Sequence, residues 1–159
     1  AKRLLQHERS GLAALASADT PGPMERIKPH VPLAQLAMQY NGETLLSDPV
    51  LRRDITDNEM RKRAFFLTQQ RAFEEASAQT PGAATSIFNY VEAEYVKSQL
   101  ELQLRIRGTQ GVGWEGEQFT EEEIRMGRLW LEAKAISIAG GSNEVQLNII
   151  AKRVLGLPD

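Results

Sequence analysis

The chain has 159 residues and a formal net charge of −2, so it is of one-domain size and nearly neutral. This balance argues against a nucleic acid or an anionic membrane as a partner held by bulk charge. It has no cysteine and only two histidines, which excludes a disulfide framework and disfavours any metal site. No apolar run reaches the roughly 18 residues that cross a bilayer, and no signal peptide is visible. We therefore expect a cytoplasmic protein.

Periodic apolar residues and helix-capping signals predict a chain made almost entirely of helices. Residues 1 to about 16 already follow an amphipathic helical pattern, and the chain starts with Ala1 rather than methionine. We therefore expect it to be a piece of a longer protein. Further helices are predicted at about 32–40, 49–79, 84–107, 120–136 and 142–154.

Short turns separate these helices. Asp48-Pro49 provides a cap and a proline at the first helical position, and Thr120 with Glu123 forms a capping box. The glycine-rich segment from Gly108 to Trp114 joins two of the long helices. Long helices joined by short turns, with no clear strand pattern, predict an all-α fold, an antiparallel helical bundle.

The last helix begins at a corner. Gly140-Gly141 can end one helix in a left-handed turn, and Ser142 can cap the next helix. A helix N-terminus attracts negative charge through its unpaired N–H groups, which suits a phosphate or a developing oxyanion. From these residues alone, a plain helical corner is the more frequent outcome.

The corner also carries a resemblance. Gly-Gly-Ser-Asn-Glu-Val-Gln at 140–146 and Asn-Ile-Ile-Ala-Lys-Arg-Val-Leu-Gly-Leu-Pro at 148–158 resemble the C-terminal signature of the acyl-CoA dehydrogenase family. The resemblance covers the whole chain, with specific motifs at its two ends and a middle that matches in helix order. It implies that residues 1–159 are the family's C-terminal helical domain, without the N-terminal helical domain and the β-domain.

The resemblance implies an FAD-dependent oxidation of an acyl-CoA to the trans-2-enoyl-CoA, as in fatty acid β-oxidation. A carboxylate removes the α proton, and hydrogen-bond donors hold the thioester oxygen. Many relatives carry the base where this chain has Gly140, whereas another branch carries it in a Glu-Arg pair on the first helix. This chain has Glu8-Arg9 there, so Glu8 is the candidate base, and the Gly140 N–H is the candidate donor to the thioester.

The same resemblance implies a flavin site. Ser142 and Glu144 fall where relatives touch FAD, although Glu144 equally suits plain compensation of the helix dipole. Gly108 and Gly111 fall in a loop that approaches FAD from a neighbouring subunit. The loop departs from the family pattern at Thr109 and Val112.

The family's Arg-x-x-Phe-Gly motif is not visible, and Arg52 or Arg53 is only a speculative substitute. We therefore keep two alternatives beside the enzyme. One is a subunit that completes the site of a partner in a hetero-oligomer, and the other is a helical interaction module. The resemblance further implies an acyl-CoA substrate, an electron-transfer flavoprotein or similar acceptor, a homo- or hetero-oligomer, and a fragment that is inactive alone. The acyl group is left open: chain length, branching or a steroid side chain.

Overall fold

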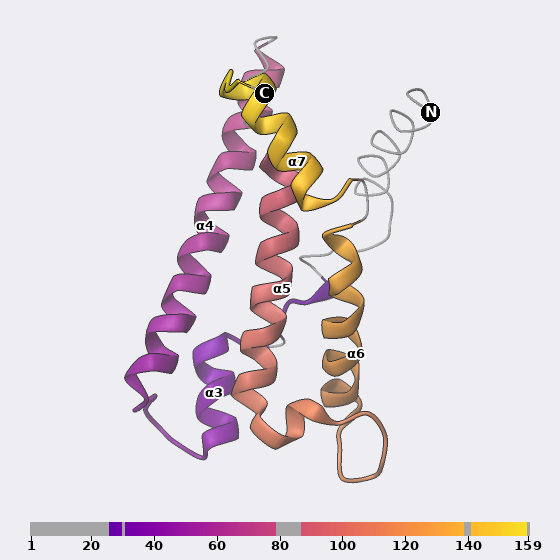
Figure 1. Cartoon of the computed structure of the whole chain (residues 1–159). Helices are drawn as coiled ribbons and strands as arrows, with labels where there is room; N and C mark the ends of the chain where they lie inside the picture. Colours follow the sequence, from indigo (N-terminus) through magenta and orange to yellow (C-terminus); the bar gives the residue numbers. More distant parts are fainter. Residues whose placement is uncertain (1–25, 30, 79–86, 139–140, 159) are drawn as a thin grey trace.

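The protein is described by a computed structural model that covers residues 26–29, 31–78, 87–138 and 141–158 (Figure 1). Every regular element within these ranges is helical, which confirms the predicted fold class. The predicted first helix, with Glu8, lies outside the described residues. The elements are α3 (Leu33–Asn41), α4 (Pro49–Ser77), α5 (Phe88–Arg107), the 3₁₀ helix η2 (Gly108–Val112), α6 (Glu121–Ile136), α7 (Asn143–Ile149) and the π-helix η3 (Ile150–Val154).

Helix α5 is the centre of the bundle, because α3, α4, α6 and α7 all pack against it (Figure 1). Two contacts show that α4 and α5 run antiparallel. Arg105 near the end of α5 bonds Asp54 near the start of α4 at 2.7 Å, and Phe88 at the start of α5 meets Phe65 edge to face at 5.7 Å.

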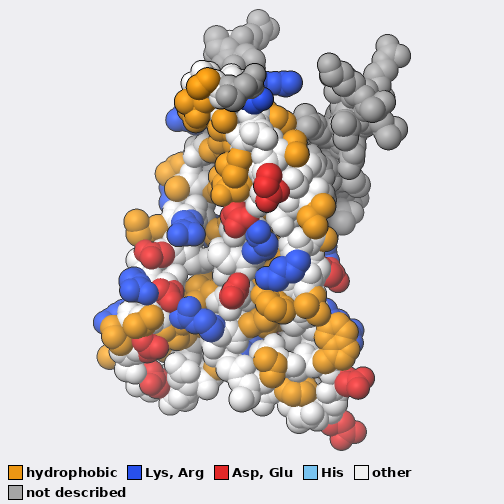
Figure 2. All heavy atoms as spheres, in the orientation of Figure 1, with side chains coloured by type: hydrophobic (Ala, Val, Ile, Leu, Met, Phe, Trp, Pro, Cys, Tyr) orange, Lys and Arg blue, Asp and Glu red, His pale blue; other side chains and the backbone are white. Residues whose placement is uncertain are grey.

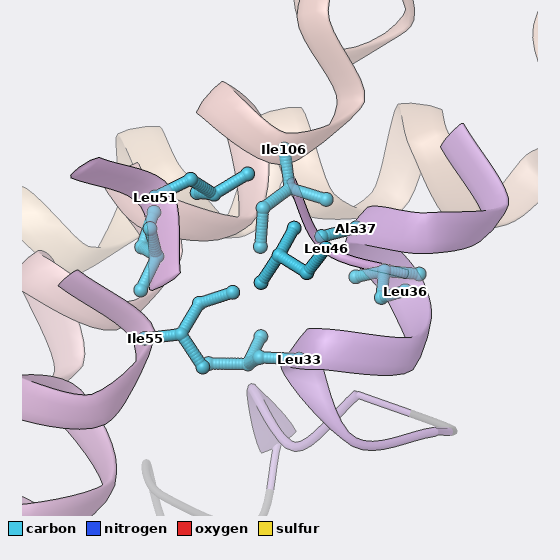
Figure 3. Packing of buried hydrophobic residues seen from close by; sticks show 8 residues of the cluster. Leu33, Leu36, Ala37, Leu46, Leu51, Ile55 and Ile106 are labelled. Carbon is cyan, nitrogen blue, oxygen red and sulfur yellow. The ribbon is translucent and has the colours of Figure 1, made fainter. Parts of the chain in front are cut away.

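The core has two parts, on opposite sides of α5. In the first, leucines of α3 and the following loop pack with Leu51 and Ile55 of α4 and Ile106 of α5 (Figure 3). In the second, Tyr95, Val96 and Leu100 of α5 pack against α6 and Ile27. Helix α5 contributes to both parts and so links them.

The capping signals at Asp48 and Thr120 are confirmed. The Asp48 side chain accepts hydrogen bonds from the N–H groups of Val50 and Leu51 at 2.8 and 3.2 Å. Gly42 ends α3 with a φ of 67°, a left-handed conformation that glycine adopts easily. The single helix predicted at 142–154 is instead an α-helix to Ile149 and a π-helix beyond it. No described helix has the length and apolar character to span a membrane.

Candidate functional site

The segment from Gly108 to Trp114 follows α5, and packing within the chain explains its glycines. Gly108 has a φ of 56° and turns the chain at the end of α5. A Cβ atom at Gly111 would lie 2.5 Å from the Leu104 carbonyl oxygen, and one at Gly113 would lie 2.5 Å from the Phe119 ring. The segment therefore folds back tightly onto the last turns of α5, and these glycines need no ligand to explain them.

An apolar groove of about 550 Å³ lies beside this segment, within the size range of small-molecule sites. On the face shown in Figure 2, apolar side chains gather over the lower ends of α5 and α6. The groove is lined by Glu101, Leu104, Arg105, Gly108, Gly111, Val112, Gly113, Trp114, Gly127, Trp130 and Leu131.

Two indoles line this groove, and each packs against a cation that lies outside the lining. Trp114 is 52% exposed, and the Arg128 guanidinium lies 5.2 Å from its ring centre. The Lys134 ammonium lies 4.3 Å from the Trp130 ring centre, and the buried Trp130 N–H has no hydrogen-bond partner among the described residues. The apolar lining with two indoles suits a planar aromatic group.

Buried polar side chains fix the end of α5 that leads into the groove. The Arg107 side chain is fully buried, and its Nη1 donates to the Gln103 carbonyl oxygen at 3.1 Å. Gln103 in turn donates to the Ile27 carbonyl at 2.7 Å. The Arg107 guanidinium also lies 5.6 Å from the Tyr40 ring centre. Helix α3, helix α5 and the segment around Ile27 therefore meet immediately before Gly108.

The start of α6 completes this arrangement. Thr120 and Glu123 exchange both hydrogen bonds of the capping box, at 2.7 and 3.3 Å, and the Tyr40 hydroxyl donates to Glu123 at 2.8 Å. Burial opposes ionisation of Glu123, but the bonds from Thr120 and Tyr40 and the charge of Arg107 leave the pKa of its carboxyl below the usual value. Glu123, in the first turn of α6, is thus held ionised at neutral pH.

The predicted corner residues lie at the other end of α5. Gly141 has a φ of 116°, and Ser142 occupies the N-cap position of α7, but its side chain makes no capping hydrogen bond. The Glu144 carboxylate accepts from its own backbone N–H and also bonds the Ser142 hydroxyl, and these bonds lower the pKa of Glu144. The Asn143 amide bonds Glu94 and so docks α7 onto α5.

The structure therefore brings Gly108 and Gly111 together at one end of α5, and Ser142 and Glu144 together at the other. Glu94, which contacts α7, precedes Gly108 by 14 residues, or about 21 Å of helix rise. Glu8 and Gly140 lie outside the described residues. The described parts of the chain hold no cluster of His, Cys, Asp or Glu that could bind a metal.

Sequence reasoning missed Arg107 and Gln103. A usable signal was present, because Gln103 and Arg107 follow Val96 and Leu100 at three- and four-residue spacings and so share their buried face. Arg52 and Arg53, the speculative substitutes for the missing motif, lie on the first turn of α4 and are exposed, and Arg53 pairs with its neighbour Asp54 at 3.0 Å.

Comparison with known proteins agrees with this fold. A family model described as acyl-CoA dehydrogenase, C-terminal domain, matches residues 1–155. The chain is 33% identical over 111 residues to acyl-CoA dehydrogenase IpdE1 of Mycobacterium tuberculosis, which is 70% of this chain and 28% of that protein. It is 47% identical over 58 residues to IpdE1 of Mycolicibacterium smegmatis, which is 36% of this chain and 14% of that protein.

Among solved structures, a variant of the Tcur3481-Tcur3483 steroid ACAD superposes with a TM-score of 0.70 at 22% identity. The superposition covers 98% of this chain and 38% of that one. The likeness supports the helical fold. This chain spans well under half of each of these relatives.

Proposed function

Since the chain belongs to the acyl-CoA dehydrogenase family as its C-terminal domain, we propose that it serves in the FAD-dependent α,β-dehydrogenation of an acyl-CoA thioester. The observation that carries the proposal is the family match over residues 1–155, together with a Glu-Arg pair at 8–9 and no carboxylate at Gly140. Glu8 is the proposed base that removes the α proton. The Gly140 N–H is the proposed donor to the thioester oxygen, where negative charge develops.

The apolar groove beside Gly108 and Gly111 suits part of the cofactor, because two indoles, Trp114 and Trp130, line it beside glycines that leave the backbone open. When bound, FAD accepts the hydride from the β carbon. Ser142 and Glu144 are proposed to contact the cofactor at the other end of α5. Within one chain, about 21 Å of helix separates the glycine pair from the pair Ser142 and Glu144. This separation favours an oligomer in which two subunits share each flavin site.

The test is Glu8→Gln in the full-length protein. The variant should keep its flavin and lose at least about 10²-fold in turnover, the low end for a general base. A panel of acyl-CoA thioesters differing in chain length, in branching and in a steroid side chain would define the substrate. Reoxidation by an electron-transfer flavoprotein would test the acceptor. Turnover that stays within a few-fold would exclude Glu8 as the base.

A second candidate is a subunit that completes a partner's site. The missing Arg-x-x-Phe-Gly motif favours it, because Arg52 and Arg53 on α4 are exposed and Arg53 is already paired. Flavin stoichiometry in the full-length complex separates the two. One flavin per subunit supports a complete site in every subunit, about half supports the site-completing role, and none supports a helical interaction module.

A further inference from the structure

Helix α4 carries large apolar side chains on the side that faces away from the bundle. Met60 is 64% exposed and Leu67 is 47% exposed. Arg63, which lies between them in the sequence, leans over the Phe66 ring at 5.6 Å and leaves both side chains uncovered. Helix α4 lies at the edge of the bundle, and its main contacts among the described elements are with α5 and α3 (Figure 1). Large apolar side chains gathered on one exposed surface mark interaction sites.

Four exposed residues, each seven positions after the last, run along this side of α4. They are Arg53, Met60, Leu67 and Glu74, and a step of seven residues returns to nearly the same side of a helix. Ala64 lies beside Met60 and Leu67 at four- and three-residue spacings, and its small side chain lets another helix come close. We will call these five residues the outer face of α4. It has a cation at its N-terminal end, an apolar middle and a carboxylate at its C-terminal end.

The charges at the two ends of the outer face are available to another molecule. The Glu74 carboxylate has no ion pair or hydrogen bond within the described parts of the chain. Arg53 pairs with Asp54 at 3.0 Å, but Asp54 is also held by Arg105 at 2.7 Å. Asp54 therefore keeps a partner when Arg53 turns to a different carboxylate.

We propose that the outer face of α4 binds the same face of a second copy of this chain, with the two helices antiparallel. Met60 then lies opposite Leu67 of the second copy, and Arg53 lies opposite Glu74 of the second copy. A two-fold axis repeats each contact, so one interface contains two ion pairs around an apolar centre. A parallel pairing in register would instead set Arg53 against Arg53 and Glu74 against Glu74, which like charges disfavour. The proposal concerns how two copies associate, and it does not depend on the proposed dehydrogenase activity.

Charge reversal tests the pairing, with association of the full-length protein measured by sedimentation velocity. Arg53→Glu or Glu74→Arg alone should weaken association at least about 10-fold, because each sets like charges against each other. The double variant Arg53→Glu with Glu74→Arg should restore it, because the two charges are only exchanged. Leu67→Glu should also weaken association. Leu45→Glu, at a leucine outside α4 that is 74% exposed, is the matched control and should have no effect.

Cysteine pairs test the register. Met60→Cys and Leu67→Cys are placed in two differently tagged copies of the full-length protein, and oxidation should link the two copies. Met60→Cys alone should not link to itself, because the two cysteines would lie seven residues, or about 10 Å, apart along the helices, beyond the reach of a disulfide. The parent protein controls for cysteines outside these 159 residues, which contain none.

Three outcomes would overturn the proposal. They are a protein that does not self-associate, association that Leu67→Glu leaves unchanged, and cysteines that link only to a different polypeptide. Circular dichroism of each variant confirms its fold. Neither sedimentation nor disulfide formation depends on flavin or turnover, so this interface and the proposed dehydrogenase function can fail independently.

Discussion

The Arg107 guanidinium lies 5.6 Å from the centre of the Tyr40 ring, which joins the last residue of α5 to α3 immediately before the glycine segment. The Arg107 side chain is fully buried, yet its Nε and Nη2 have no hydrogen-bond partner among the described residues. The Arg107 Nη2 lies 3.7 Å from the Glu122 carboxylate, and the Arg107 charge also lowers the pKa of Glu123. Arg107 therefore contributes both packing and a buried positive charge at the end of α5.

Arg107→Met fills the same space but leaves Glu122 and Glu123 without this cation, so it should lower the free energy of unfolding, by less than the roughly 3–5 kcal/mol of a fully buried pair because Glu122 is partly exposed. Arg107→Ala should cost about 2–5 kcal/mol more than Arg107→Met, the range for truncating methionine in a core. Denaturant unfolding followed by tryptophan fluorescence measures both. If the two variants are equally destabilised, the guanidinium itself is required.

Thr120→Ala should destabilise the chain by about 1 kcal/mol, since it removes the side chain that caps α6 through the Glu123 N–H at 3.3 Å. Thr120→Ser is the matched control, because it keeps the hydroxyl. Thermal unfolding of the three proteins gives the comparison. Equal midpoints for Thr120→Ala and the parent chain would show that the capping box contributes nothing here.

The pH dependence of stability should report on Glu123. Its pKa is lower in the folded chain than in the unfolded chain, so its contribution is present above the usual glutamate pKa of about 4.3 and is lost as the pH falls through the folded value. Glu123→Gln should flatten the stability curve below about pH 5. Urea unfolding at stepped pH tests this, with Glu117→Gln as an exposed control. A slope equal to that of the parent chain would contradict it.

Local signals predicted most of the fold, because they depend on residues close in sequence. The Asp48 cap and the capping box at Thr120 lie where their residue types predict them. Contacts between residues far apart in the sequence were harder to predict. The sequence could not show that Trp114 stays half-exposed, or that Phe73 is 75% exposed, because exposure depends on what packs alongside. Nor could it show that Gly111 is required by the Leu104 carbonyl.

Substitutions in the glycine segment should differ in cost. Gly111→Ala places a Cβ atom 2.5 Å from the Leu104 backbone oxygen, which cannot move without distorting α5. Gly108→Ala meets no atom within 4 Å and bears only the strain of a φ of 56°, about 1 kcal/mol. Gly111→Ala should therefore be the more destabilising, and it should also weaken FAD binding in the full-length protein. Unfolding and flavin-binding titrations that rank the two variants in the opposite order would contradict this reading of the segment.

The last prediction concerns Glu8 and Gly140, which the family resemblance places as two alternative positions for one base. If both positions face the same α carbon, Glu8→Gly combined with Gly140→Glu should recover part of the activity that Glu8→Gly loses. The requirement is that a carboxylate lies within about 3 Å of the proton that it removes, since geometry precedes pKa in the choice of a base.

Recovery should be partial, because Gly140 adjoins the turn at Gly141, where φ is 116° and a Cβ atom would lie 2.9 Å from the Gln146 amide. A bulky neighbour at 140 must fit against this turn. The measurement is turnover of the full-length double variant with acyl-CoA, normalised to its bound flavin. A folded, flavin-loaded double variant no faster than Glu8→Gly would show that the two positions do not serve the same site.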